Sequence, residues 1–200
     1  MTLRFLLAPG AGAASSSAGM QRLCGLLAEL GPVQTFDYPY MQASAGGRRK
    51  APDKLPVLIA HHRAELERLR ASAASDDVLV LAGKSMGSRV GCHLSVEQEV
   101  AGLVCFGYPL RGQNGKLRDE VLLALTAPIL FVQGTRDPLC RLDELEQVRA
   151  RMSARSELFV VEGGDHSLEC SKTALKARGH TADDVDRAIQ SAVRAFCATL

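Results

Sequence analysis

Short apolar runs alternate along the chain with longer segments in which apolar residues recur every three or four positions. Apolar runs of about four to eight residues bounded by turn residues predict buried strands, and the wider spacing predicts amphipathic helices. The predicted strands cover residues 3–8, 33–38, 78–82, 100–106, 129–133 and 158–161. The predicted helices cover residues 55–69, 86–94, 117–125 and 142–152, with a first helix capped by Ser16 or Ser17 and a last one that begins at Thr181.

Strands that alternate with helices pair in parallel through right-handed crossovers, and the helices cover both faces of the sheet. We therefore expect an α/β fold of about six parallel strands in one domain, residues 1–200, with no large lid domain inserted after the strand at 100–106. Ligands bind such sheets beyond the carboxyl ends of the strands. The loops after Ala8, Ala82, Gln133 and Val161 fall there, and the Gly-, Pro- and base-rich connection 39–54 could border the same cleft.

Charge and cysteine content narrow the class of protein. The formal net charge is only +2, with acids and bases interspersed. The protein therefore has no strong electrostatic field that would attract nucleic acid or an anionic membrane. No apolar stretch approaches the roughly 20 residues of a membrane span, and the run at 5–8 is too short for a secretion signal. Six scattered cysteines without a C-x-x-C pair suggest reduced thiols. We expect a cytoplasmic protein that needs no metal and no cofactor.

The segment Gly83-Lys84-Ser85-Met86-Gly87 joins an apolar strand to a predicted helix. Glycines two positions before and after a serine let a strand turn sharply into a helix and expose the serine hydroxyl at the top of the sheet. The five-residue pattern alone is common by chance, and its place between a strand and a helix strengthens it. Ser85 is therefore the candidate nucleophile.

A serine hydroxyl needs a base to accept its proton and a carboxylate to orient that base. Ser85 is followed in sequence by Asp137 and then His166, each in a loop just after a predicted strand, which is the Ser–acid–His order of α/β hydrolases. Taken singly, the three could be a packing turn, a helix cap and a loop hydrogen-bonding group. Their shared placement at strand ends favours catalysis.

The backbone N–H groups of Met86 and Ala11 are the candidate oxyanion-hole donors, with Gly12 as an alternative to Ala11. Tyr108 and Arg111 are candidate substrate-binding residues at the cleft edge, and Arg111 could anchor an acidic substrate group.

Other residues are given structural interpretations. Lys84 and Arg89 are expected at the surface or in a packing ion pair. The adjacent His61 and His62 are expected as a solvated or half-buried pair rather than a metal site.

A nucleotide site is the main competing interpretation of the first loop. Gly10-Ala11-Gly12 follows a strand, and Asp37 ends the next one, which resembles a dinucleotide fingerprint. Ser15 stands where the third glycine belongs, and the serine, acid and histidine together explain more residues. A phosphate-binding P-loop would need a glycine where Val78 stands and is excluded.

Five segments carry a family resemblance: residues 36–40, 83–89, 107–110, 131–138 and 164–167. They resemble the small α/β hydrolases of the testis-expressed-protein-30-like group, which is similar to the hydrolase-like domain in a subunit of a chromatin acetyltransferase complex and distantly to dienelactone hydrolases. The resemblance runs through nearly the whole chain and implies a compact hydrolase sheet lacking the first two strands of larger relatives. It departs at Pro9, where such hydrolases often have histidine before the glycine.

Two functions follow as expectations. The first is a serine hydrolase that cleaves a small ester, thioester or related acyl compound through an acyl-Ser85 intermediate. The second is a hydrolase-fold interaction module with an idle triad and a protein partner, suggested by the resemblance to a complex subunit and by Pro9. The geometry around Ser85 and the reaction with a fluorophosphonate probe distinguish the two.

Overall fold

In the computed structural model, which describes residues 2–43, 50–112 and 115–200, six parallel strands form one sheet in the order β2-β1-β3-β4-β5-β6. The predicted parallel sheet is confirmed. After β2 the chain returns across β1 to begin β3, so the strand order reverses beside β1. The strands are β1 Leu3–Ala8, β2 Val33–Thr35, β3 Val78–Lys84, β4 Gly102–Phe106, β5 Ile129–Gly134 and β6 Ser156–Val161.

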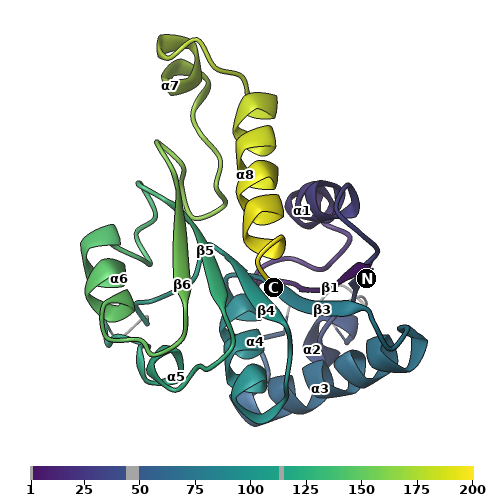
Figure 1. Cartoon of the computed structure of the whole chain (residues 1–200). Helices are drawn as coiled ribbons and strands as arrows, with labels where there is room; N and C mark the ends of the chain where they lie inside the picture. Colours follow the sequence, from purple (N-terminus) through teal and green to yellow (C-terminus); the bar gives the residue numbers. More distant parts are fainter. Residues whose placement is uncertain (1, 44–49, 113–114) are drawn as a thin grey trace.

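Helices cover both faces of the sheet (Figure 1). Helices α1 and α8 pack on one face, and α3, α4, α5 and α6 contribute to the core on the other. None of the helices in the described part of the chain is long and apolar enough to cross a membrane. Their bounds are α1 Ala18–Ala28, α2 Pro39–Gln42, α3 Leu55–Ser72, α4 Met86–Glu97, α5 Glu120–Leu123, α6 Leu142–Arg149, α7 Lys172–Ala177 and α8 Ala182–Cys197.

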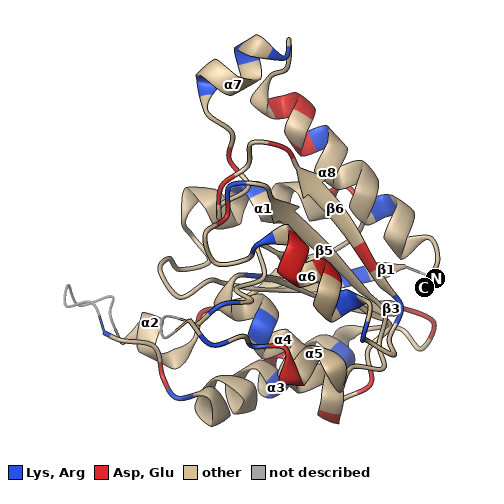
Figure 2. Ribbon diagram, turned by 90° about the vertical axis from the view of Figure 1, so that its left-hand side faces the viewer, with Lys and Arg blue, Asp and Glu red and all other residues tan. Residues whose placement is uncertain are grey.

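The strand residues divide between two apolar cores because successive side chains of a strand point to opposite faces. On β3, Leu81 packs with α3 and α4, whereas Val80 and Ala82 pack with α1 and α8. Both faces are therefore apolar, which explains the unbroken apolar runs in the sequence. Acidic and basic residues intermingle along the outer helices and loops (Figure 2).

The segment after β2 differs most from the prediction. The strand ends at Thr35 instead of continuing to residue 38. Phe36 packs against His62 of α3, with ring centroids 5.0 Å apart, and this packing draws the segment toward α3. Pro39 then begins the short helix α2 inside the predicted connection, where a proline fits the first helical turn. Residues 44–49 of that connection lie outside the described part.

The C-terminal third contains one helix that the apolar spacing did not indicate. Helix α7 buries none of its six residues, so it carries no apolar stripe. Its N-cap is Ser171, whose hydroxyl accepts a hydrogen bond from the N–H of Ala174 at 3.2 Å. The last helix begins as predicted after Thr181, which forms a capping box with Asp184: each side chain accepts a hydrogen bond from the backbone N–H of the other residue.

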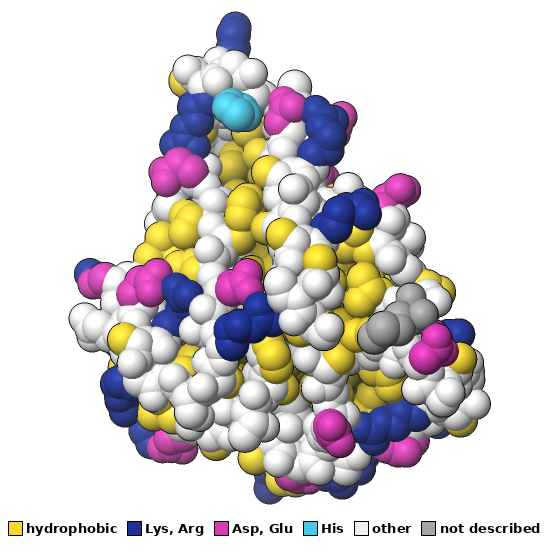
Figure 3. Space-filling view, viewed as in Figure 1, with side chains coloured by type: hydrophobic (Ala, Val, Ile, Leu, Met, Phe, Trp, Pro, Cys, Tyr) yellow, Lys and Arg dark blue, Asp and Glu magenta, His cyan; other side chains and the backbone are white. Residues whose placement is uncertain are grey.

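An apolar groove of about 570 Å³ runs between the edge strand β6 and helix α8, beneath α7. Apolar side chains gather there on the face seen in Figure 3. Phe159, Val160, Leu175 and Val185 line the groove, and Val160 is 37% exposed. The protruding α7–α8 segment thus forms one wall of a surface depression.

Candidate active site

The turn from β3 into α4 holds Ser85 in a strained conformation. Its φ of 50° and ψ of −112° place a non-glycine residue in a region that side chains rarely adopt. A Cβ on Gly87 would lie 2.5 Å from the carbonyl oxygen of Ala8 and 2.6 Å from that of Pro9. Gly83 is crowded in the same way by the backbone of Gly87 and Ser88. Both glycines of the pattern are therefore required by close backbone packing.

Ser85, His166 and Asp137 form a continuous hydrogen-bonded chain. The Nε2 of His166 lies 2.8 Å from the Oγ of Ser85, and its Nδ1 lies 2.8 Å from Oδ2 of Asp137. A carboxylate only accepts hydrogen bonds, so Nδ1 carries the hydrogen and Nε2 of the neutral ring is left to accept the serine proton. The side chain of Asp137 is fully buried, whereas that of His166 is 27% exposed.

Gln133 is a residue of this site that the sequence interpretation missed. Its Nε2 donates to Oδ2 of Asp137 at 2.5 Å, and its Oε1 accepts from the backbone N–H of Tyr108 at 2.9 Å. The N–H of Leu139 donates to the other Asp137 oxygen at 2.8 Å. The signal in the sequence was a polar residue at the end of the apolar run 129–133. The Asp137 carboxylate is thus fixed by donors besides the histidine.

Lys84 supports the His166 loop through a hydrogen bond to its backbone. Its Nζ donates to the backbone oxygen of His166 at 2.5 Å. Burial lowers the pKa of Lys84 to about 8, and the nearby charges of Asp137 and Asp165 oppose that change. The expectation of a surface residue or packing ion pair was wrong for Lys84, because its side chain is largely buried and bonds to the backbone of the His166 loop. Gly107 leaves room for this contact, since a Cβ there would lie 3.1 Å from the Lys84 Nζ.

The loop after β1 lies directly against the nucleophile. A Cβ on Gly10 would come within 3.6 Å of the Ser85 Cβ. Ala11 is exposed at the cleft, and its carbonyl oxygen accepts the Tyr40 hydroxyl at 3.1 Å. Met86 is the first residue of α4, a position whose N–H has no acceptor within the helix. The loop and helix start therefore border the Ser85 hydroxyl from two sides, and their use as an oxyanion hole remains a prediction.

A cleft of about 390 Å³ opens above the serine. Ser85 and His166 line it together with the apolar side chains of Met20 and Leu23 from α1. The remaining lining is small or polar: Gly10, Ala11, Gly12, Ala13, Ser17, Gly19, Lys84, Ser167 and Glu169. Its volume is near the lower end of ordinary small-molecule sites, about 300–1,000 Å³.

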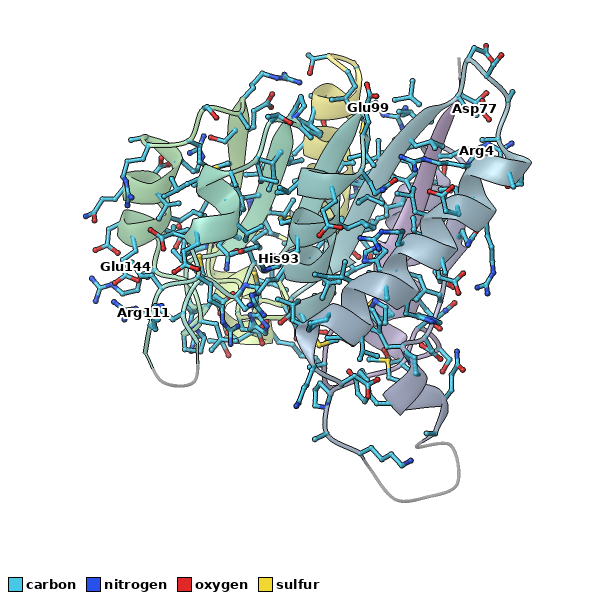
Figure 4. The ribbon with its side chains drawn as sticks, turned by 90° about the horizontal axis from the view of Figure 1, so that it is seen from below. Arg4, Asp77, His93, Glu99, Arg111 and Glu144 are labelled. Carbon is cyan, nitrogen blue, oxygen red and sulfur yellow. The ribbon has the colours of Figure 1, made fainter. Side chains whose placement is uncertain are left out.

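The two predicted substrate-binding residues lie elsewhere. Tyr108 is fully buried, and its hydroxyl donates to the backbone oxygen of Arg118 at 3.1 Å. Arg111 pairs through two nitrogens with Glu144, one at 2.8 Å, and also donates to the backbone oxygen of Gly115. The Arg111–Glu144 pair lies at the outer edge of the molecule (Figure 4). Neither residue lines the cleft. The Tyr108 hydroxyl is hydrogen-bonded inside the core, and the Arg111 guanidinium is paired with Glu144.

The structure also shows the positions of Asp37, from the dinucleotide-like pattern, and of His62, from the histidine pair. Oδ1 of Asp37 accepts the backbone N–H of Ser15 at 2.6 Å, so this carboxylate closes the loop after β1. His62 is fully buried with Nδ1 3.3 Å from the Tyr38 hydroxyl, instead of solvated or half buried. Burial lowers its pKa to about 3. Within the described ranges, no group of three or more His, Cys, Asp or Glu residues could hold a metal ion.

A parallel sheet of this order, with a serine presented on a strained strand–helix turn, defines the α/β-hydrolase class. Residues 1–198 match the family described as an alpha/beta hydrolase domain. The chain belongs to this family. The narrower resemblance to the testis-expressed-protein-30-like group remains a prediction.

Solved structures with the same fold include bacterial serine hydrolases. An α/β serine hydrolase homologue from Coxiella burnetii is 19% identical, with a TM-score of 0.70 over 95% of this chain and 84% of that one. A lidless α/β serine hydrolase from Xanthomonas campestris is 20% identical, with a TM-score of 0.70 over 97% and 82%. Est1E from Butyrivibrio proteoclasticus is 12% identical, with a TM-score of 0.68 over 98% and 89%. At these identities the likeness concerns the fold.

Proposed function

We propose that this protein is a serine hydrolase that cleaves a small ester, thioester or related acyl compound through an acyl-Ser85 intermediate. The observation that carries the proposal is the chain from Ser85 through His166 to Asp137, with both hydrogen-bond distances at 2.8 Å and a cleft open above the serine. The function needs no cofactor, since these side chains supply a nucleophile, a base and its orienting carboxylate.

In the first half of the reaction, Ser85 Oγ attacks the substrate carbonyl carbon while its proton passes to Nε2 of His166. The negatively charged Asp137, buried against Nδ1, stabilises the resulting imidazolium. The carbonyl oxygen becomes an oxyanion, for which the N–H groups of Met86 and Ala11 are the proposed donors; one such donor contributes about 3–4 kcal/mol of transition-state stabilisation. The imidazolium then gives its proton to the leaving group as the carbon–heteroatom bond breaks.

The second half releases the acyl group. His166 accepts a proton from water, whose oxygen attacks the acyl-serine carbonyl and forms a second tetrahedral intermediate. Collapse of that intermediate returns the proton from Nε2 to Ser85 Oγ and releases a carboxylic acid. No other proton carrier is needed, because the same nitrogen faces Ser85 throughout.

A compact acyl compound fits the cleft better than a long-chain lipid. The small residues at 10–13 let a carbonyl approach the backbone, and Met20 and Leu23 offer a limited apolar wall. Among proteins with the same fold, Est1E has been solved with ferulic acid bound, at 13% identity and a TM-score of 0.66 over 100% of this chain and 89% of that one. A panel of short aliphatic and aromatic esters and thioesters is the corresponding substrate screen.

Labelling with a fluorophosphonate probe tests the proposal. The wild type and Ser167→Ala should react, because Ser167 lines the same cleft but its hydroxyl is outside the triad. Ser85→Ala should not react, and His166→Ala should react far more slowly. Equal labelling of wild type and Ser85→Ala would refute acyl transfer through Ser85.

The interaction-module alternative is supported by the resemblance to a complex subunit and by Pro9 in the first loop. It requires an idle triad, so folded wild-type protein would resist the probe and hydrolyse no ester in the panel. The hydrogen-bonded Ser85 and His166 favour the enzyme.

The cytoplasm is the proposed location, and cell fractionation tests it.

A further inference from the structure

A second cavity, of about 240 Å³, lies against helix α4 and the segment that precedes α5. It shares no lining residue with the cleft at Ser85. Its side chains carry an excess of positive charge, with Arg89 from α4, and Lys116 and Arg118 from the segment that precedes α5. His93 of α4 also lines the cavity, and burial together with the charge of Arg89 lowers its pKa. Figure 4 shows His93 well separated from the Arg111–Glu144 pair, so the two groups form different sites. The full lining is Arg89, His93, Lys116, Leu117, Arg118, Glu120 and Val121.

The strongest evidence for a ligand in this cavity is the unpaired side chain of Arg89. Arg89 is half buried, and no carboxylate within the described ranges forms an ion pair with it, so of the two sequence expectations, a surface residue or a packing ion pair, the ion pair is not formed. Its Nε is buried without a hydrogen-bond partner, and so is Nε2 of His93, one helical turn further on. Buried donors normally have partners, so the protein leaves part of this guanidinium's capacity unused.

Arg118 adds a second poorly neutralised guanidinium. Its hydrogen bond is a long one, 3.5 Å from Nη1 to the backbone oxygen of Pro109. Burial and the neighbouring charge of Arg89 both lower the pKa of Arg118. Glu120, the carboxylate in the lining, is 85% exposed and lies 3.5 Å from Lys116. Like charges held together in a partly buried pocket are unfavourable unless an anion enters.

We infer that the cavity lined by Arg89, His93 and Arg118 binds a phosphate group, either as inorganic phosphate or on a small phosphomonoester. Donors reach the cavity from two chain segments, and a phosphate has several oxygens that accept in different directions. The volume is below that of ordinary small-molecule sites, about 300–1,000 Å³, which fits a phosphate group with little attached.

This site is independent of the proposed hydrolase reaction. Ser85 is the N-cap of α4 and Arg89 lies four residues later in this helix, where its backbone N–H donates to the Ser85 carbonyl oxygen at 3.2 Å. The side chain, however, faces the second cavity and not the cleft. Phosphate binding should therefore persist in Ser85→Ala, whether or not Ser85 is a nucleophile.

Isothermal titration calorimetry with inorganic phosphate, at constant ionic strength, tests the inference. We expect saturable binding by the wild type and Ser85→Ala, and at least about tenfold weaker binding by Arg89→Gln and Arg118→Gln. Arg194→Gln is the matched control, because it removes the same charge from an exposed position on α8, which covers the other sheet face. Absence of saturable binding by the wild type, or equal affinity in Arg89→Gln and Arg194→Gln, would overturn the site.

Two further measurements identify the ligand and guard against a misfolded variant. The affinity for glycerol phosphate, compared with that for inorganic phosphate, distinguishes a phosphomonoester ligand from the free ion. If acetate competed as effectively as phosphate, the result would contradict a phosphate site. In the unaltered protein, phosphate titration should shift the NMR resonances of the His93 ring. Unchanged His93 resonances during saturable binding would place the anion elsewhere and refute the assignment.

Discussion

Replacing Lys84 by methionine tests the electrostatics beneath the candidate site. The ammonium group is largely buried beside the Ser85 turn, and burial lowers its pKa from 10.5 to about 8. In the unfolded chain the same lysine titrates near 10.5, so between these two pH values the unfolded state binds more protons. The free energy of unfolding that Lys84 contributes must therefore increase as pH rises from about 8 to 10.5, and it is lowest and constant below about pH 8.

The magnitude follows from the difference between the two pKa values. Each pH unit in the window contributes about 1.4 kcal/mol, so the full change is at most about 3–4 kcal/mol. Methionine keeps a similar apolar stem and removes the titrating group. It also removes the donor to the His166 carbonyl oxygen, which lowers stability by about 1–3 kcal/mol independently of pH in this window.

Urea unfolding of wild type and Lys84→Met, measured from pH 7 to pH 10, gives the difference directly. Other titrating groups cancel in that difference because both proteins contain them. We expect the wild type to gain about 2–3 kcal/mol relative to the variant between pH 7.5 and pH 10. Lys172→Met, at an exposed position of α7, should show no such trend. A pH-independent difference for Lys84→Met would show that the ammonium is well solvated and refute the reasoning.

Gln133→Leu should lower kcat for ester hydrolysis and reduce unfolding free energy by about 2–4 kcal/mol, because it removes a donor to the Asp137 carboxylate and an acceptor for a backbone N–H; kinetics unchanged from wild type would show that Gln133 does not position Asp137. Gly87→Ala should destabilise the protein by about 1–3 kcal/mol or more, since its Cβ would lie 2.5 Å from the Ala8 oxygen. Gly25→Ala, where a Cβ on helix α1 meets nothing within 4 Å, should instead stabilise by about 0.5–1 kcal/mol. Thermal or urea unfolding checks both glycine variants, and equal effects would contradict the packing of the elbow.

The elements predicted most reliably from sequence were those with a strong local pattern. The run 129–133 is apolar on both faces and forms β5 within one residue of its predicted end. Helix α7 has no apolar stripe and was missed, since its ends are set by a cap at Ser171 and not by burial. The strand after residue 33 was predicted too long because Phe36 packs on a helix instead of the sheet, a contact that alternation within the segment does not encode.

The sequence by itself determined the parallel sheet and the order in which Ser85, Asp137 and His166 follow its strands. These features depend on short-range periodicity and on the rule that parallel strands end at one edge. Only the tertiary structure decided that the three side chains meet at 2.8 Å, that Tyr108 is buried, and that Arg111 pairs with Glu144. Such contacts join residues far apart in the chain, so their partners depend on how all the segments pack together.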